Sequence, residues 1–178
     1  MRLMAERVLL RPFAEGDAPV FAAYRSDPDV ARYQGWDAPF SLAQAEEFVR
    51  EVAALDVDEP GWFQFAVEVG GELVGDVGVN LHPNRMQAEI GYTLAPAHQG
   101  RGYATEAVRR VLEHLFDERG LYRVGAECDA RNERSARLLT RLGFRQEGHR
   151  VRSTWIKGEW TDDLLFGLLA EEWRERMI

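Results

Sequence analysis

The chain has 178 residues, of which 22 are Lys or Arg and 30 are Asp or Glu, so its formal net charge is −8. This length suits one domain, residues 1–178, and the acidic balance disfavours a general nucleic-acid binder, which requires a basic surface. With one cysteine, scattered histidines and no apolar run of membrane or secretory type, we expect a cytoplasmic protein without a disulfide, a metal ion or a membrane partner.

The N-terminal third predicts a strand and two helices around an irregular aromatic stretch. Residues 7–13 form the strand, and Asp17 is the expected N-cap of the first helix. Residues 31–40 are aromatic and irregular. Ser41 and Gln44 have the spacing of a capping box, which predicts the start of the second helix.

Three strands follow as an antiparallel meander. They are expected at residues 62–69, 72–79 and 86–94, and Gly70 and Gly71 form the first hairpin turn.

The second half predicts a crossover. Apolar residues at spacings of three and four indicate a helix over residues 104–116, and the next strand is expected at 121–128. A strand that is reached through a helix runs parallel to the strand before it, so the 121–128 strand is parallel to 86–94. The remaining expected elements are a short helix from Asn132 to Gly143, a hairpin of strands at 150–156 and 160–168, and a tail helix within 168–178.

The turn that precedes the 104–116 helix has the features of an anion site. Gly100 and Gly102 allow a tight turn and leave backbone N–H groups uncovered. The first N–H groups of a helix have no internal partner, and the helix dipole adds positive charge there, so phosphate is the expected ligand. The turn matches neither the Walker nor the dinucleotide glycine pattern, and a plain strand-to-helix turn is the alternative interpretation.

Two motifs carry a resemblance to a known family. The first is Gln99-x-x-Gly102-x-Ala104, and the second, about thirty residues later, is Asn132-x-x-Ser135 in a helix that ends at Gly143-Phe144. This pair resembles the GNAT superfamily of acyl-CoA-dependent N-acetyltransferases. Three further motifs are similar to the branch of bacterial ribosomal-protein N-terminal acetyltransferases: Leu9-Leu10-Arg11-Pro12, Glu89-Ile90-Gly91-Tyr92 and Glu172-Trp173.

The resemblance implies a single-domain α/β fold and a site for acetyl-CoA. The expected fold is a twisted mixed sheet of about seven strands, with helices on both faces and a splay between the two central parallel strands. The pantetheine arm of acetyl-CoA would fill the splay near Thr93 and Leu94, and Asn132 would contact the arm or serve only as a helix cap. The resemblance implies that the pyrophosphate rests on Gln99, Gly100, Arg101, Gly102, Tyr103, Ala104 and Thr105. The side chain of Arg101 would add charge-assisted hydrogen bonds or remain solvated.

Two residues are the candidates for catalysis. Glu89 lies on the strand beside the expected thioester and is the first choice as general base, with Glu127 and Asp129 as alternatives; an ion pair or edge residue is the other interpretation. Many GNAT members carry a tyrosine further along the helix that follows Asn132, but this chain has none there. Ser135, or a water that it holds, is therefore the candidate acid for the departing thiolate.

The acceptor is expected to be an amine that binds among aromatic residues. Trp36 and Trp155 are candidate pocket walls or core residues, and Asp37 is a candidate for holding a cationic acceptor. The predicted reaction is direct acetyl transfer to a protein or peptide N-terminal amine, whose pKa of about 8 needs only a modest base. A small amine, such as an amino acid, a polyamine or an aminoglycoside-like compound, is the alternative, and a CoA-sensing module without turnover is the alternative from another class. Either a monomer or a homodimer is compatible with the sequence.

Overall fold

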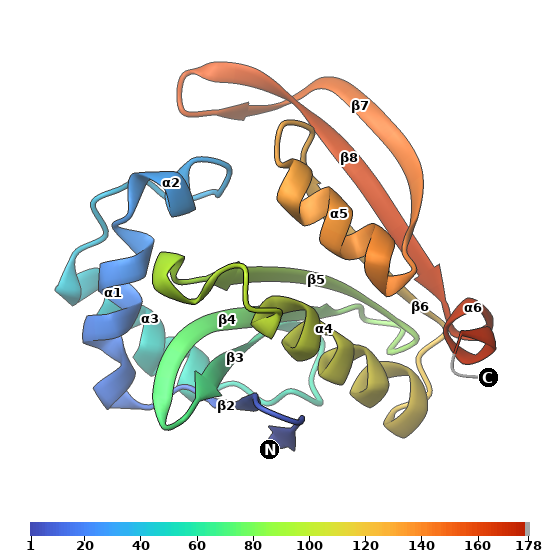
Figure 1. The fold of residues 1–178 in the computed structure, drawn as a ribbon, viewed down its shortest axis with the longest axis horizontal. Helices are drawn as coiled ribbons and strands as arrows, with labels where there is room; N and C mark the ends of the chain where they lie inside the picture. Colours follow the sequence, from blue (N-terminus) through green and yellow to red (C-terminus); the bar gives the residue numbers. More distant parts are fainter. Residues whose placement is uncertain (177–178) are drawn as a thin grey trace.

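One mixed sheet of eight strands runs through the computed structural model, which describes residues 1–176 (Figure 1). The strand order is β1-β2-β3-β4-β5-β6-β8-β7, and every neighbouring pair is antiparallel except β5 and β6, which are parallel. The strands are β1 (Leu3–Met4), β2 (Leu9–Pro12), β3 (Gly61–Val69), β4 (Glu72–Leu81), β5 (Gln87–Leu94), β6 (Arg123–Asp129), β7 (Arg145–Ile156) and β8 (Glu159–Leu169).

Six α-helices and three short helical turns accompany these strands in the described part of the chain. The α-helices are α1 (Ala18–Arg25), α2 (Pro28–Ala31), α3 (Leu42–Ala53), α4 (Tyr103–Glu113), α5 (Glu133–Leu142) and α6 (Ala170–Glu175). The short turns are the 3₁₀ turns η1 (Glu15–Asp17) and η2 (Pro96–His98) and the π-helical turn η3 (His114–Glu118). Within residues 1–176, no helix combines the length and the apolar character that crossing a bilayer demands.

The fold confirms the predicted α/β class, with one strand more than the sequence indicated. The additional strand, β1, has only two residues, and it pairs Leu3 with Leu10. A pair of residues is too short to show the alternation that identifies a strand. The strand β7 begins at Arg145, five positions before the predicted residue 150, because its largely exposed edge position leaves few apolar residues to mark it. The last two residues of the predicted tail helix lie outside the described residues.

Helix N-termini follow the local chemistry of the sequence in two of the three cases for which a cap was predicted. The Ser41 hydroxyl accepts from the Gln44 N–H at 3.1 Å, and the Gln44 side chain accepts from the Ser41 N–H at 2.9 Å, which confirms the capping box. Asn132 caps α5 through its side-chain oxygen. Asp17 precedes α1 but makes no cap, because its carboxylate accepts from the Arg11 guanidinium at 2.7 and 2.8 Å.

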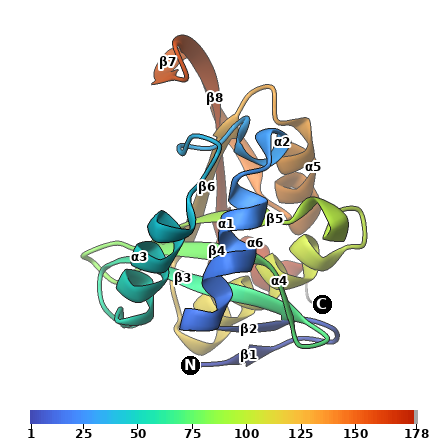
Figure 2. The same cartoon turned by 90° about the vertical axis from the view of Figure 1, so that its left-hand side faces the viewer.

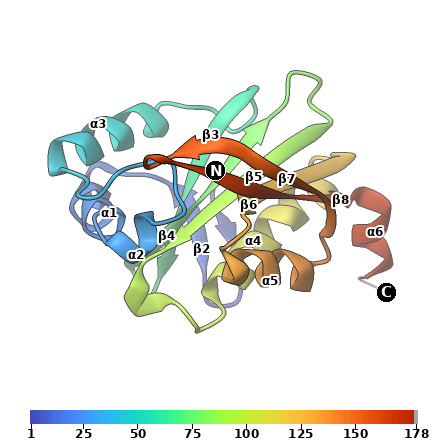
Figure 3. The same cartoon turned by 90° about the horizontal axis from the view of Figure 1, so that it is seen from above.

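Helices cover both faces of the sheet and create two separate clusters of buried side chains. Ala66 packs with α1 and α3, whereas the adjacent Val67 packs with α4, because successive side chains of a strand point to opposite faces. Figure 2 shows α1 and α3 in front of the sheet and α4 behind it. Seen from above, the β7–β8 hairpin runs from the α6 end of the molecule to the end that carries α1 and α2 (Figure 3).

Candidate functional site

The two parallel strands in the middle of the sheet separate along half of their length. They pair only from Gln87 to Ile90 on β5, opposite residues 123–126 on β6. Beyond these residues β5 continues to Leu94 and β6 to Asp129, and each stays paired with its outer neighbour, β4 or β8. The sheet therefore opens between β5 and β6, which confirms the predicted splay.

The opening exposes backbone groups of β5. The Ala95 N–H donates to the Val74 carbonyl at 2.8 Å and the His82 N–H donates to the Gln87 carbonyl at 2.9 Å. Because the hydrogen-bonding direction alternates along an antiparallel strand, these bonds direct the backbone of Thr93 toward β4 and those of Tyr92 and Leu94 toward the opening.

Backbone groups inside a sheet are normally paired. The Leu94 carbonyl accepts from the Gln99 side chain at 3.0 Å. The Tyr92 groups and the Leu94 N–H remain directed into the opening, so an extended ligand that carries amide groups can pair with them.

The glycine turn, residues 99–105, lies at the end of β5 and presents a row of N–H groups. Gly100 and Gly102 have φ angles of +76° and +84°, a region that glycine adopts without strain. Gly102 is the N-cap of α4 and the Glu106 N–H donates to its carbonyl at 3.0 Å. The N–H groups of residues 100–105 donate to no described residue. These N–H groups at a helix N-terminus form a site for an anion.

Arg7, a residue that the sequence analysis missed, anchors this turn to the start of β2. Its guanidinium forms an ion pair with Glu106 at 2.8 Å and donates to the Arg101 carbonyl at 3.1 Å. The same carboxylate accepts the backbone N–H groups of Arg7 at 2.5 Å and Val8 at 3.0 Å. Burial opposes the negative charge of Glu106, yet these hydrogen bonds lower its pKa below the ordinary value.

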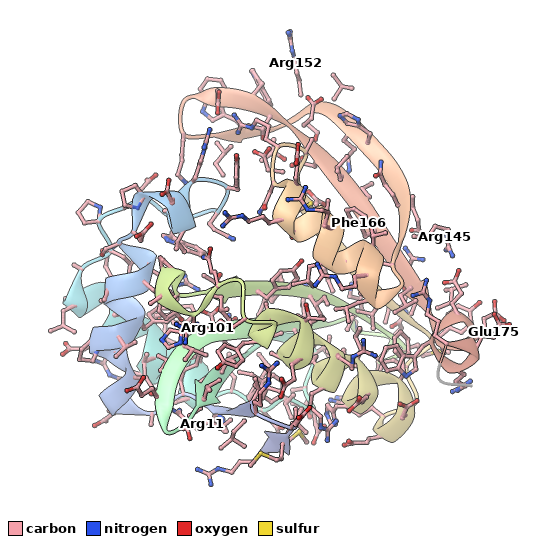
Figure 4. The ribbon with its side chains drawn as sticks, in the orientation of Figure 1. Arg11, Arg101, Arg145, Arg152, Phe166 and Glu175 are labelled. Atoms are coloured by element: carbon pink, nitrogen blue, oxygen red, sulfur yellow. The ribbon has the colours of Figure 1, made fainter. Side chains whose placement is uncertain are left out.

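The turn carries further positive charge from α5. Arg134 donates to the Gln99 side chain at 3.0 Å, and Arg141 lies 3.4 Å from the Thr105 hydroxyl. Arg101 itself forms no ion pair with any described residue, and Figure 4 shows it beside the turn. An anion at the glycine turn would therefore meet backbone donors and several guanidinium groups.

One face of the opening is closed by Ser135. Its hydroxyl lies 2.7 Å from the Tyr92 phenol on β5, and it lies beside the Cys128 thiol on β6. Asn132 fixes the same turn of α5, since its side chain accepts from the Ser135 N–H at 3.2 Å. Burial raises the pKa of Tyr92 above its ordinary value and the pKa of Cys128 to about 11, so both groups stay protonated near neutral pH.

The opposite face carries the carboxylates that were predicted as bases. Glu127 accepts from Arg150 at 2.9 Å and Asp129 pairs with Arg131 at 2.7 Å, whereas Glu89 has no hydrogen bond or ion pair with any described residue. Burial raises the pKa of Glu127. Of the three carboxylates, Glu89 is therefore the one available to a ligand.

Space for a ligand exists between Glu89 and the opening. Gly91 lies between Glu89 and Thr93 on the same face of β5, and a Cβ built on Gly91 would have no atom within 4 Å. A larger residue at position 91 would occupy this space, so the glycine leaves a path from the free carboxylate to the opening.

A cavity lies further out, between α2 and the tip of the β7–β8 hairpin. It is lined by Pro28, Ala31, Arg32, Asp37, Ala38, Arg131, Lys157 and Glu159. Lys157 donates to the carbonyls of Gln34 at 2.6 Å and Trp36 at 2.8 Å, and these bonds tie the hairpin tip to the loop before α3.

The structure brings Asp37 to this cavity but neither of the predicted tryptophan walls lines it. The Trp36 indole N–H donates to the Arg25 carbonyl at 3.0 Å, and the Arg25 guanidinium lies 3.9 Å from the ring centre. Trp155 packs edge-on against Trp160 at 5.4 Å between ring centres and is 59% exposed. Trp36 thus holds the loop against α1, and Trp155 lies on the outer hairpin.

The sequence also matches known proteins. Residues 7–145 match the family described as "Acetyltransferase (GNAT) domain". An uncharacterized N-acetyltransferase of Bacillus licheniformis, p20, is 32% identical over 173 residues, which cover 96% of this chain and 97% of the relative.

Two further relatives are a solved structure and an enzyme whose name states its substrate. A GNAT-family acetyltransferase from Bacillus anthracis has a TM-score of 0.88 and 29% identity, and the match covers 96% of this chain and 99% of that one. Spermidine N(1)-acetyltransferase of Escherichia coli K12 is 28% identical over 159 residues, which cover 88% of this chain and 82% of the relative.

We predict that Gly102→Asp removes the anion site. The substitution places a negative charge against the N–H groups of the glycine turn, so the affinity for acetyl-CoA should fall by about 100-fold or more. Gly102→Asn is the matched control, because it has the same size and backbone demand without the charge, and it should retain most of the affinity. Titration calorimetry measures both, and equal affinities in the two variants would contradict an anion at this turn.

Proposed function

Because the chain belongs to the GNAT acetyltransferase family, we propose that it transfers the acetyl group of acetyl-CoA directly to the α-amino group of a peptide or protein N-terminus. Acetyl-CoA-dependent N-acetyl transfer is the activity of this family. The observation that carries the proposal is the opening between β5 and β6. Glu89, which forms no ion pair with any described residue, lies where the two strands still pair, and the glycine turn lies at the other end, after β5.

The proposed position of acetyl-CoA follows the unpaired backbone groups. The pyrophosphate would accept from the N–H groups of residues 100–105, with Arg101 and Arg7 adding positive charge beside it. Tyr92 and Leu94 would pair with the amide groups of the pantetheine arm, and Asn132 would border the arm from α5. Thr93 lies between Tyr92 and Leu94, but its side chain is buried and its backbone groups face β4, so they would not pair with the arm.

The residues around the opening supply what acetyl transfer requires. The amine attacks the thioester carbonyl carbon, the new C–N bond forms and the C–S bond breaks. Glu89 would accept the proton that the amine loses, directly or through a water. The Tyr92 N–H, which is directed into the opening on the Glu89 side of Leu94, would stabilise the oxyanion, while the Tyr92 carbonyl and the Leu94 N–H pair with the arm. The Ser135 hydroxyl would bond the departing thiolate.

The charges around the cavity support a single amine rather than a polyamine as acceptor. Of the acidic side chains at the opening and at the outer cavity, Glu127, Asp129 and Glu159 form ion pairs with arginine residues. Arg32 and Lys157 add positive charge to the lining. Glu89 and Asp37 are the carboxylates of this set without an ion pair to a described residue, and an α-amine needs only one of them, whereas a polyamine carries several ammonium groups. We therefore include in the proposal that the acceptor is of the same kind as that of the ribosomal-protein N-terminal acetyltransferases, namely a protein N-terminus.

A small amine is the second candidate, and one observation supports it. The spermidine N(1)-acetyltransferase relative acetylates a polyamine by its name and covers most of this chain. Asp37, which lines the outer cavity, would then hold a distant ammonium group.

We expect Glu89→Gln to lower kcat by about 10- to 100-fold while leaving the acetyl-CoA affinity unchanged. The deficit should shrink as the pH rises through the amine pKa of about 8, because the acceptor then loses its proton to solvent before it attacks. Glu72→Gln, on the exposed β3–β4 hairpin, is the control and should behave as wild type. A wild-type rate at pH 7 in Glu89→Gln would exclude Glu89 as the base.

The acceptor is tested by thiol release from acetyl-CoA with a panel of amines. We expect peptides with a free N-terminus to exceed spermidine and spermine in kcat/KM by at least about tenfold, a difference of about 1.4 kcal/mol in transition-state stabilisation. The same peptides with an acetylated N-terminus are the matched control and should be inert. A preference for spermidine would favour the small-amine alternative, and acetyl-CoA binding without release for any amine would favour a sensing module.

A further inference from the structure

The helix α5 carries no tyrosine of its own, but a tyrosine from β5 reaches it. Tyr92 lies in the unpaired part of β5, and its side chain crosses the opening to reach Ser135 on α5. The phenol oxygen is 2.7 Å from the Ser135 hydroxyl oxygen and 3.2 Å from the Ser135 carbonyl oxygen. These two residues are 43 positions apart in the sequence, so only the fold brings them together.

The geometry restricts what each hydroxyl can do. The Tyr92 side chain is partly buried against the core beneath α4 and α5, and Ser135 is the side-chain partner that the described residues offer to its phenol. A phenol has one hydrogen, so when it donates to the Ser135 oxygen the Ser135 hydrogen is free for another acceptor. The Cys128 sulfur lies beside Ser135. With acetyl-CoA bound, the proposed acceptor of the Ser135 hydrogen is the thioester sulfur.

We propose that Tyr92 is a positioning residue, which donates a hydrogen bond to Ser135 and thereby directs the Ser135 hydroxyl toward the departing sulfur of CoA. This inference rests on the proposed role of Ser135 in the transfer reaction. It adds a strand residue to a step for which the sequence indicated only Ser135, or a water that Ser135 holds.

The electron and proton balance of the step is simple. When the C–S bond breaks, its electron pair stays on sulfur, and the Ser135 O–H bonds the thiolate without giving up its proton. The thiolate is protonated by solvent after release, since its conjugate thiol has a pKa near 8.5. Burial raises the pKa of Tyr92, so the phenol remains a donor and does not supply the proton.

The test is a double-mutant cycle of Tyr92→Phe and Ser135→Ala. Each variant removes one hydroxyl and leaves the rest of the side chain or its packing in place. We expect Tyr92→Phe to lower kcat by about tenfold and to change the dissociation constant of acetyl-CoA by less than about twofold. Ser135→Ala should lower kcat at least as much, and the double variant should be no slower than Ser135→Ala. Tyr122→Phe removes an exposed phenol and is the matched control.

The outcomes separate this inference from the acceptor proposal, because the cycle uses any amine that the wild-type enzyme acetylates. Rate losses that multiply in the double variant would show that Tyr92 acts independently of Ser135 and would overturn the inference. So would a Tyr92→Phe variant with the wild-type kcat, or one whose only change is weaker acetyl-CoA binding. An unchanged kcat in Ser135→Ala would overturn both the role of Ser135 and that of Tyr92.

Discussion

The early end of pairing between β5 and β6 is the constraint on which the rest of the site depends. The two strands stay bonded to β4 and β8 but do not pair with each other beyond Ile90 and Ala126, so backbone groups of Tyr92 and Leu94 are left without strand partners. Unpaired groups inside a sheet are costly, and a ligand with its own amides can satisfy them. This feature of the backbone is therefore the basis of the proposed site for acetyl-CoA.

The glycine turn and α5 border the same opening, and each is held in place by contacts that extend beyond it. Glu106 connects the N-terminus of α4 to Arg7 and Val8, which fixes the N–H groups that an anion would meet. On α5, Asn132 and Tyr92 fix Ser135 from two directions. In the proposed complex, the glycine turn would hold the diphosphate end, and α5 would border the thioester end beside Glu89.

The features that could be predicted from the sequence were those encoded within a few neighbouring residues. The capping box of Ser41 and Gln44 and the glycine turn each lie within one short segment, and the meander and the crossover follow from local periodicity. The contacts of Arg7 with Glu106 and of Tyr92 with Ser135 could not be predicted, since they join residues far apart in the chain and depend on strand order. The tryptophans were hard to place for a related reason, because an aromatic side chain suits a pocket wall, a loop anchor or an exposed hairpin equally well until its neighbours are known.

The most direct measurement is amide hydrogen exchange, resolved by residue, with and without saturating acetyl-CoA. Bound in the opening, acetyl-CoA should slow exchange at the N–H groups of Tyr92, Leu94 and residues 100–105, because these groups gain acceptors. Exchange at Gly70 and Gly71, in the distant β3–β4 turn, should not change. Binding that leaves Tyr92, Leu94 and the glycine turn unprotected would contradict a ligand held by the open edges of β5 and β6.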